Sequence, residues 1–206
     1  MSQKIYSPGQ LVYRKALEDP SKPIIIVTGP AGSGKTALAC EWAQDNMIRK
    51  RFNKLILTKP AVGVDESHGF LPGTLDKKMK PWVQPLMDEL DGLPGKIAQR
   101  VEMAPLSFMR GRTFNESIVI ADEMQNSTSS QMKMILTRLG ENSKMIVTGD
   151  VDQHDRHDTS GLEELLRISV HMDLQYIQHV MLDTHDIQRH PAVAEVLGLY
   201  DRTDNN

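Results

Sequence analysis

The sequence has little of what characterises secreted, membrane-embedded or disordered proteins. Cys40 is the single cysteine among 206 residues, so an internal disulfide is excluded and a reducing, cytoplasmic setting is favoured. No apolar run approaches the roughly 20 residues that a transmembrane helix needs. Residues 1–4 lack the apolar core of a signal peptide. We therefore expect a cytoplasmic protein with no membrane partner, in which Cys40 is a small core residue rather than a reactive thiol.

Neither sign of charge dominates. The net charge of −3 provides no global attraction for nucleic acid, so any such binding has to depend on a local patch. A hydrophobic content of 39% and a charged content of 25% are typical of a globular domain with a full core. We find no internal repeat and no linker, and we expect one domain over residues 1–200 followed by a polar tail over residues 201–206.

The strongest motif is a phosphate-binding loop of the pattern G-x-x-x-x-G-K-[ST]. Its residues are Gly29, Pro30, Ala31, Gly32, Ser33, Gly34, Lys35 and Thr36. A β-branched run at residues 24–27 predicts a buried strand before the loop, and residues 37–43 predict a helix after it. We expect Lys35 to reach the β- and γ-phosphates of ATP and the hydroxyl of Thr36 to ligate Mg²⁺. The order strand, loop, helix disfavours the alternative of an ordinary glycine-rich turn.

The second strong signal is a pair of carboxylates directly after a predicted central strand at residues 117–121. Asp122 is expected to hold Mg²⁺, directly or through water, and Glu123 to act as the general base that activates the attacking water. The alternative is a strand that ends in solvated acids. Gln125 is a further polar group at the same edge of the sheet.

A helix is predicted upstream of the loop, with Ser7 as N-cap, Pro8 as first residue and its end near Leu17. Gln10 lies in this helix and has both a donor and an acceptor for the edge of an adenine base. From the residue alone, a solvated surface glutamine is an equal alternative.

The remaining pattern alternates strands with helices, which indicates an α/β fold with a mostly parallel sheet. Further strands are predicted at residues 55–58, 100–103, 144–148 and 174–182, and further helices at residues 74–90, 127–139, 161–168 and 192–199.

Several charged clusters have two interpretations each. The basic residues at 49–54 suit a solvated helix end, and those at 77–80 form a weak candidate for a polynucleotide-binding face. Arg110 and Arg112 are placed to meet phosphates or acidic partners in a bidentate manner. Residues 154–158 have the composition of metal ligands but not the spacing of a closed site, so we interpret them as an exposed loop.

Eight motifs in order give the chain a clear resemblance to the PhoH-like family of P-loop ATPases, whose nucleotide core looks like the first motor domain of superfamily 1 helicases. They are GPAGSGKT at 29–36, KPA at 59–61, GFLPG at 69–73, APLSFMRGRT at 104–113, DEMQN at 122–126, LTRLG at 136–140, TGDVDQ at 148–153 and DIQRHP at 186–191. The resemblance implies a three-layer, RecA-like P-loop NTPase fold in a single domain. Relatives carry a more apolar stretch where this chain has the His- and Asp-rich residues 154–158.

The resemblance also implies roles for individual residues. Gln10 would read adenine, and Asp150 and Gln153 would sense the γ-phosphate; Thr148 is an alternative to Gln153 in this role. Arg189 resembles an arginine finger. Superfamily 1 helicases supply such an arginine from a second motor domain, for which 206 residues leave no room. We therefore expect Arg189 to act in trans within a homo-oligomer, by resemblance a hexameric ring.

Three functions fit these residues. The first is a Mg²⁺-dependent ATPase that works as a helicase-like motor on RNA or single-stranded DNA. The second is an ATP-binding regulatory or stress-response switch of the phosphate-starvation type, with little motor activity. The third is a kinase-like transferase, which the Asp122–Glu123 pair and the segment at 149–153 disfavour because they suit water activation. Glu123 favours hydrolysis over a pure switch, and we expect no nuclease activity.

Overall fold

The computed structural model describes residues 5–60, 84–90, 92–153 and 160–188. Within them, six strands form one sheet in the order β3-β2-β4-β5-β1-β6, and all five pairings are parallel. The strands are β1 (Ile24–Thr28), β2 (Lys54–Thr58), β3 (Val101–Met103), β4 (Ser117–Ala121), β5 (Lys144–Gly149) and β6 (Ile177–Met181). The α/β class and the parallel sheet predicted from the sequence are confirmed.

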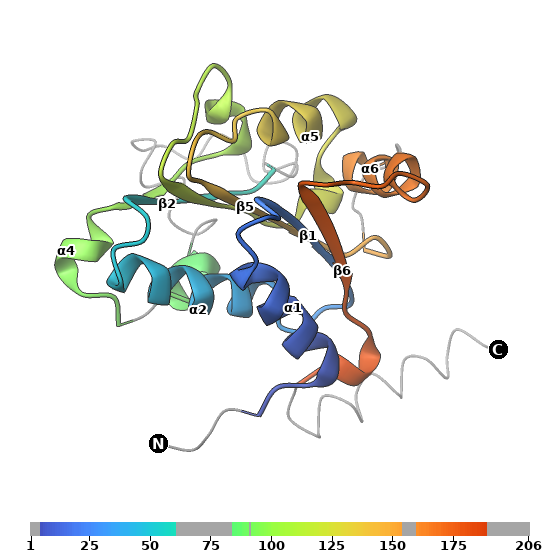
Figure 1. The fold of residues 1–206 in the computed structure, drawn as a ribbon, viewed down its shortest axis with the longest axis horizontal. Helices are drawn as coiled ribbons and strands as arrows, with labels where there is room; N and C mark the ends of the chain where they lie inside the picture. Colours follow the sequence, from blue (N-terminus) through green and yellow to red (C-terminus); the bar gives the residue numbers. More distant parts are fainter. Residues whose placement is uncertain (1–4, 61–83, 91, 154–159, 189–206) are drawn as a thin grey trace, which may run out of the picture.

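Helices connect the strands and cover both faces of the sheet (Figure 1). They are α1 (Pro8–Glu18), α2 (Lys35–Ile48), α4 (Gly95–Ala98), α5 (Ser129–Leu136) and α6 (Gly161–Ser169), with short 3-10 helices η1 (Leu106–Met109), η2 (Met124–Asn126) and η3 (Thr184–Asp186). Residues 84–88 are also helical. No helix in the described ranges is both long and apolar enough to span a bilayer.

Alternate residues of each central strand face opposite sides, which gives two cores. Ile25 and Val27 of β1 pack against α1 and α2, while Ile26 between them packs with residues from η1, η2, α5 and α6. Parallel strands covered on both faces need apolar residues on both, and this explains the continuous Ile-Val runs in the sequence. Figure 1 shows α1 and α2 on one side of the sheet and α5 and α6 on the other, which is the expected three-layer architecture.

The strand order brings three loops together at one edge of the sheet. β4, β5 and β1 are neighbours, so their carboxyl ends place the phosphate loop, the Asp122–Glu123 pair and the turn after Gly149 side by side. Ligands of open α/β sheets bind at this edge.

Two predicted elements are shorter in the structure. Helix α5 begins after Thr128, whose hydroxyl accepts a hydrogen bond from the backbone N–H of Gln131, and it ends at Leu136. The prediction that it continues to Leu139 is wrong, because Leu139 forms an isolated β-bridge with Phe114. The last strand is β6 rather than residues 174–182. The predicted helix at 192–199, the tail at 201–206 and most of the helix at 74–90 lie outside the described residues.

Candidate functional site

The phosphate loop between β1 and α2 depends on glycine. Gly29, Gly32 and Gly34 have φ angles of 149°, 84° and 90°, which other residues rarely adopt. Gly29 also lies against the backbone of β6's end, where a Cβ atom would be 2.5 Å from the carbonyl oxygen of Leu182. Gly34 is the N-cap of α2 and offers no side chain to the first N–H groups of the helix. Those N–H groups, at the positive end of the helix dipole, are a suitable site for a phosphate.

The amine of Lys35 lies over this loop. Its Nζ donates to the carbonyl oxygens of Gly29 and Pro30, at 2.5 and 2.9 Å. The ammonium group is therefore held at the concave side of the loop, where the phosphates of a nucleotide would be expected.

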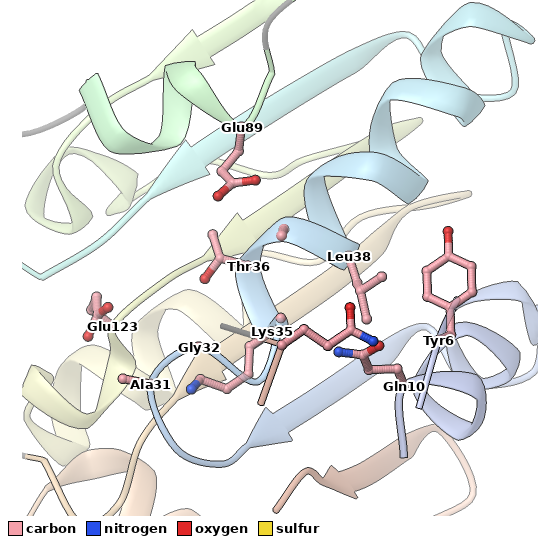
Figure 2. A pocket seen from close by; sticks show the side chains of 12 residues that line it. Tyr6, Gln10, Ala31, Gly32, Lys35, Thr36, Leu38, Glu89 and Glu123 are labelled. Atoms are coloured by element: carbon pink, nitrogen blue, oxygen red, sulfur yellow. The ribbon is translucent and has the colours of Figure 1, made fainter. Parts of the chain in front are cut away.

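A cavity of about 490 Å³ opens over the loop. It is lined by Tyr6, Gln10, Ala31, Gly32, Gly34, Lys35, Thr36, Ala37, Leu38, Glu89, Glu123 and Gln188. Figure 2 shows Tyr6 and Gln10 at one end and Glu123 at the other, with Lys35 between them. Sequence reasoning missed Tyr6, Glu89 and Gln188 as lining residues. Gln188 was inside the motif at 186–191, whereas Tyr6 and Glu89 belong to none of the motifs.

The candidate metal ligands converge below the loop. The hydroxyl of Thr36 donates to Oδ1 of Asp122 at 2.7 Å, and the hydroxyl of Thr148 donates to the same oxygen at 2.5 Å. Asp122 is 8% exposed. These oxygen donors fit Mg²⁺, which is usually held by one or two protein oxygens together with water and substrate phosphates. The described residues contain no cluster of three His, Cys, Asp or Glu side chains that could hold a metal. The segment at 154–158 lies outside the described residues.

Glu123 has a backbone conformation that is unusual for a residue with a side chain. Its φ and ψ angles are 54° and 37°, in the left-handed region. Such conformations cost free energy and cluster at functional sites. The side chain of Glu123 is exposed and lines the cavity, while its Oε2 accepts a hydrogen bond of 2.5 Å from Nε2 of the buried Gln125.

Gln10 is 3% exposed, so the interpretation as a solvated surface glutamine is wrong. Its Nε2 donates to the carbonyl oxygens of Ser33 in the phosphate loop and Asp186 in η3, at 3.0 and 3.1 Å. Its Oε1 accepts from the backbone N–H of Ser7 at 3.1 Å, which completes the predicted cap of α1. Gln10 lines the cavity and connects three segments, but both N–H groups of its amide are already used.

The two γ-phosphate candidates after β5 differ in burial. Asp150 is 6% exposed and its backbone N–H donates to Oε1 of Gln125, whereas the side chain of Gln153 is exposed; neither residue is in the cavity lining. Arg189 lies outside the described residues. The residue before it, Gln188, lines the cavity, and its backbone N–H donates to the carbonyl oxygen of Gly32 at 3.3 Å.

Several basic side chains after α2 and near β3 are engaged within the chain, namely those of Arg51, Lys54, Arg100 and Arg112. Arg112 forms a bidentate pair with Glu102, at 2.6 and 2.9 Å, which is the acidic-partner alternative predicted for it. Arg112 and Lys54 together hold the pKa of Glu102 at about 2. Arg51 contacts Glu18 and Asn46, which supports the helix-end interpretation of residues 49–54. The basic residues at 77–80 lie outside the described residues.

Cys40 is fully buried in the core on the α1–α2 side of the sheet. Burial raises the pKa of its thiol well above the usual value, so the thiol stays protonated. The prediction that Cys40 is a core residue is confirmed.

A family profile described as PhoH-like protein matches residues 4–201 of this chain. The PhoH-like protein of Bacillus subtilis (strain 168) is 41% identical over 98% of this chain and 65% of its own length. Protein PhoH of Escherichia coli (strain K12) is 45% identical over 76% of this chain and 47% of its own length. The chain therefore spans less than two thirds of the length of each of these relatives.

Among solved structures, the crystal structure of Pif1 helicase from Candida albicans aligns with 88% of this chain and 40% of its own, at 16% identity and a TM-score of 0.45. A Pif1 helicase from Bacteroides, in complex with ADP-AlF3 and ssDNA, aligns with 95% of this chain and 46% of its own, at 15% identity and a TM-score of 0.42.

Proposed function

The chain belongs to the PhoH-like protein family, and on that premise we propose that it binds ATP with Mg²⁺ over residues 29–36 and hydrolyses the terminal phosphate. The observation that carries the proposal is the position of Glu123. This carboxylate comes from the end of β4, yet it lines the same cavity as Lys35 and Thr36 of the phosphate loop. A protein that only binds nucleotide has no need of a base at that place.

In the proposed reaction, the N–H groups at the start of α2 and the ammonium of Lys35 bind the phosphates. Mg²⁺, held by Thr36 and Asp122, would supply positive charge to the β- and γ-phosphate oxygens. Glu123 accepts a proton from water while the water oxygen bonds to the terminal phosphorus. The bond from that phosphorus to the bridging oxygen breaks, and ADP leaves with the electron pair.

The decisive experiment measures phosphate release from ATP, with and without Mg²⁺, together with binding of a fluorescent nucleotide. Glu123→Gln should retain nucleotide binding and lose hydrolysis by about 100-fold or more, since general bases contribute roughly 10²- to 10⁴-fold. Lys35→Ala should lose binding as well. Glu163→Gln is a matched control, because Glu163 is an exposed glutamate on α6. A wild-type protein that binds Mg·ATP but releases no phosphate would contradict the proposal.

Assembly and partners belong to the same proposal. We expect a hexameric ring in which Arg189 acts in trans, and action on RNA or single-stranded DNA in the cytoplasm; the support is family resemblance. Native mass measurement tests the ring. ATPase rates with and without RNA or single-stranded DNA, at low and moderate salt, test the polynucleotide. Stimulation that falls as salt rises is expected for a motor, whereas turnover unchanged by either strand would favour the regulatory switch.

A further inference from the structure

Gln125 forms a bridge that none of the roles above requires. Its side chain is buried, at 3% exposed, between the ends of β4 and β5. Nε2 donates to Oε2 of Glu123, and Oε1 accepts the backbone N–H of Asp150 at 3.1 Å. One amide therefore joins the proposed base to the first residue after β5.

The chemistry of the two neighbours allows only one orientation of this amide. The N–H of Asp150 needs an acceptor, and the carboxylate of Glu123 needs a donor. A flipped amide would place its NH₂ group against an N–H and its oxygen against a carboxylate, which are two repulsive contacts. The bridge is thus polarised, with its donor end directed at the base.

Packing holds Gln125 in place. Gly149 approaches so closely that a Cβ atom there would lie 2.9 Å from Oε1 of Gln125 and 2.4 Å from Cδ2 of Leu162. Gln125 also lies within the short helix η2, which begins directly after Glu123. The amide therefore has little freedom to rotate away while the turn at Gly149 keeps its position.

The carboxylate of Glu123 has more freedom without this bridge. The residue is exposed and lines the cavity, and its described side-chain hydrogen bond is the one from Gln125. A hydrogen bond to one carboxylate oxygen restricts the rotamers and leaves the other oxygen to accept a proton from water. A base gains most of its effect from being held in the productive orientation.

We propose that Gln125 is a positioning residue, which fixes the orientation of Glu123 and makes it depend on the position of the turn at Gly149–Asp150. This inference rests on the proposed function, since it assumes that Glu123 acts as the base. If that turn shifts, Oε1 of Gln125 no longer accepts the backbone N–H of Asp150. Nε2 of Gln125 is then no longer held in the orientation in which it donates to Glu123. Base activation and the position of the turn are coupled through one side chain.

The sharpest test is Gln125→Glu, which is nearly isosteric. It keeps an acceptor for the N–H of Asp150 but turns a carboxylate oxygen toward Glu123. Two carboxyl groups so close share a proton, and the apparent pKa of the pair rises. We expect the acid limb of the kcat–pH profile to move up by about one unit or more and kcat at pH 7 to fall by about 10-fold or more, while the Kd for fluorescent ATP changes less than about 2-fold. The split between kcat and Kd carries the test: a purely structural role would weaken nucleotide binding along with kcat, whereas the added carboxylate moves the acid limb in either case.

Gln125→Met is the second variant, because it conserves volume and removes both hydrogen bonds. We expect its kcat to fall by about 10-fold or more with an unchanged acid limb and unchanged nucleotide Kd. Gln99→Glu is the matched control, since Gln99 is exposed and remote from the cavity lining. If Gln125→Glu does not fold, the split between kcat and Kd in Gln125→Met decides.

The outcomes separate the two proposals. Wild-type protein that does not hydrolyse Mg·ATP overturns the proposed function and this inference together. Wild-type turnover with Gln125 variants that keep the wild-type kcat and acid limb overturns the role of Gln125 alone. Variants in which nucleotide Kd weakens as much as kcat falls would also overturn it, because the residue would then support the loop rather than the base.

Discussion

The hydroxyl of Thr36 lies 2.7 Å from the carboxylate of Asp122, although 86 residues separate them in the chain. Thr36 is the second residue of α2, which follows β1, and Asp122 follows β4, while β5 lies between these two strands. Thr148 of β5 donates to the same carboxylate oxygen. Three neighbouring strands therefore bring three side-chain oxygens to one place beneath the phosphate loop.

This convergence predicts the effect of Asp122→Asn. The amide oxygen still accepts from both hydroxyls, so folding should be preserved, but the negative charge that attracts Mg²⁺ is lost. We expect the Mg²⁺ concentration for half-maximal ATPase activity to rise by about 10-fold or more and kcat to fall by about 100-fold. A Mg²⁺ titration of turnover measures both. Asp173→Asn changes an exposed aspartate and should behave as wild type; an unaltered Mg²⁺ requirement in Asp122→Asn would rule out the metal role.

Gln10→Met tests whether the buried amide connects segments or reads the base. The change leaves the carbonyls of Ser33 and Asp186 and the N–H of Ser7 without their partner. Because each buried unsatisfied group costs about 1–3 kcal/mol, we expect a loss of roughly 2–4 kcal/mol in the free energy of unfolding. Urea denaturation measures it. If Gln10 also reads the adenine base, the KM of the variant should rise for ATP but not for GTP. If Gln10 only connects the segments, the KM values for ATP and GTP should change equally.

Mixed oligomers test where Arg189 acts. Arg189→Ala should retain nucleotide binding and lose most hydrolysis, since an arginine at the transferring phosphoryl group is worth about 10³- to 10⁵-fold. If it acts in trans, mixing this variant with Glu123→Gln subunits should restore part of the turnover. The contact of Gln188 with Gly32 brings the preceding residue to the cavity of its own subunit. Mixed assemblies without any recovered activity would favour action in cis.

Lys144 predicts a pH-dependent stability. The residue is 5% exposed, and its amine donates to the carbonyls of Ala16 and Asp19 at the end of α1. Burial lowers its pKa from 10.5 to about 8. The unfolded chain therefore binds more protons between about pH 8 and 10.5, and the native state gains stability as pH rises through that window. The gain is fully absent below pH 8 and amounts to about 3 kcal/mol above 10.5.

The comparison with Lys144→Met isolates this effect. The difference in free energy of unfolding should move in favour of the wild type by up to about 3 kcal/mol between pH 8 and 10.5. Burial raises the pKa values of Tyr13 and Cys40, which acts in the opposite direction but occurs in both proteins. Parallel stability curves for the two proteins would contradict the prediction.

Gly9→Ala should be destabilising, although alanine usually strengthens a helix. A Cβ atom at Gly9 would lie 2.4 Å from Oδ2 of Asp186. That carboxylate cannot move freely, because it accepts from the hydroxyl of Ser7 and the N–H of Asp183. We expect a loss of about 1–3 kcal/mol and a Tm lower by roughly 3–10 °C, measured by thermal denaturation. Gly95→Ala is the control, because no atom lies within 4 Å of its added Cβ, and it should leave Tm unchanged or raised.

Much of the architecture is local in origin and could be predicted. The apolar runs at residues 24–28 and 117–121 specify buried parallel strands, and Ser7 with Pro8 specifies the start of α1. The phosphate loop could be predicted from its own glycines, because Gly29, Gly32 and Gly34 adopt positive φ angles that other residues rarely adopt. The end of α5 could not be predicted in this way, because it depends on Leu139 pairing with Phe114.

The sequence by itself determined which residues the phosphate loop and the carboxylate pair contain, since both are short segments with local requirements. Only the tertiary structure decided which partner each polar side chain meets. Gln10 bonds to Asp186, which is 176 residues away, and Gln125 bonds to Asp150, which is 25 residues away. Arg112 pairs with Glu102, an acidic side chain of the same chain. The physical reason is that burial removes water as a partner, so each group bonds to whatever donor or acceptor the strand order brings within reach.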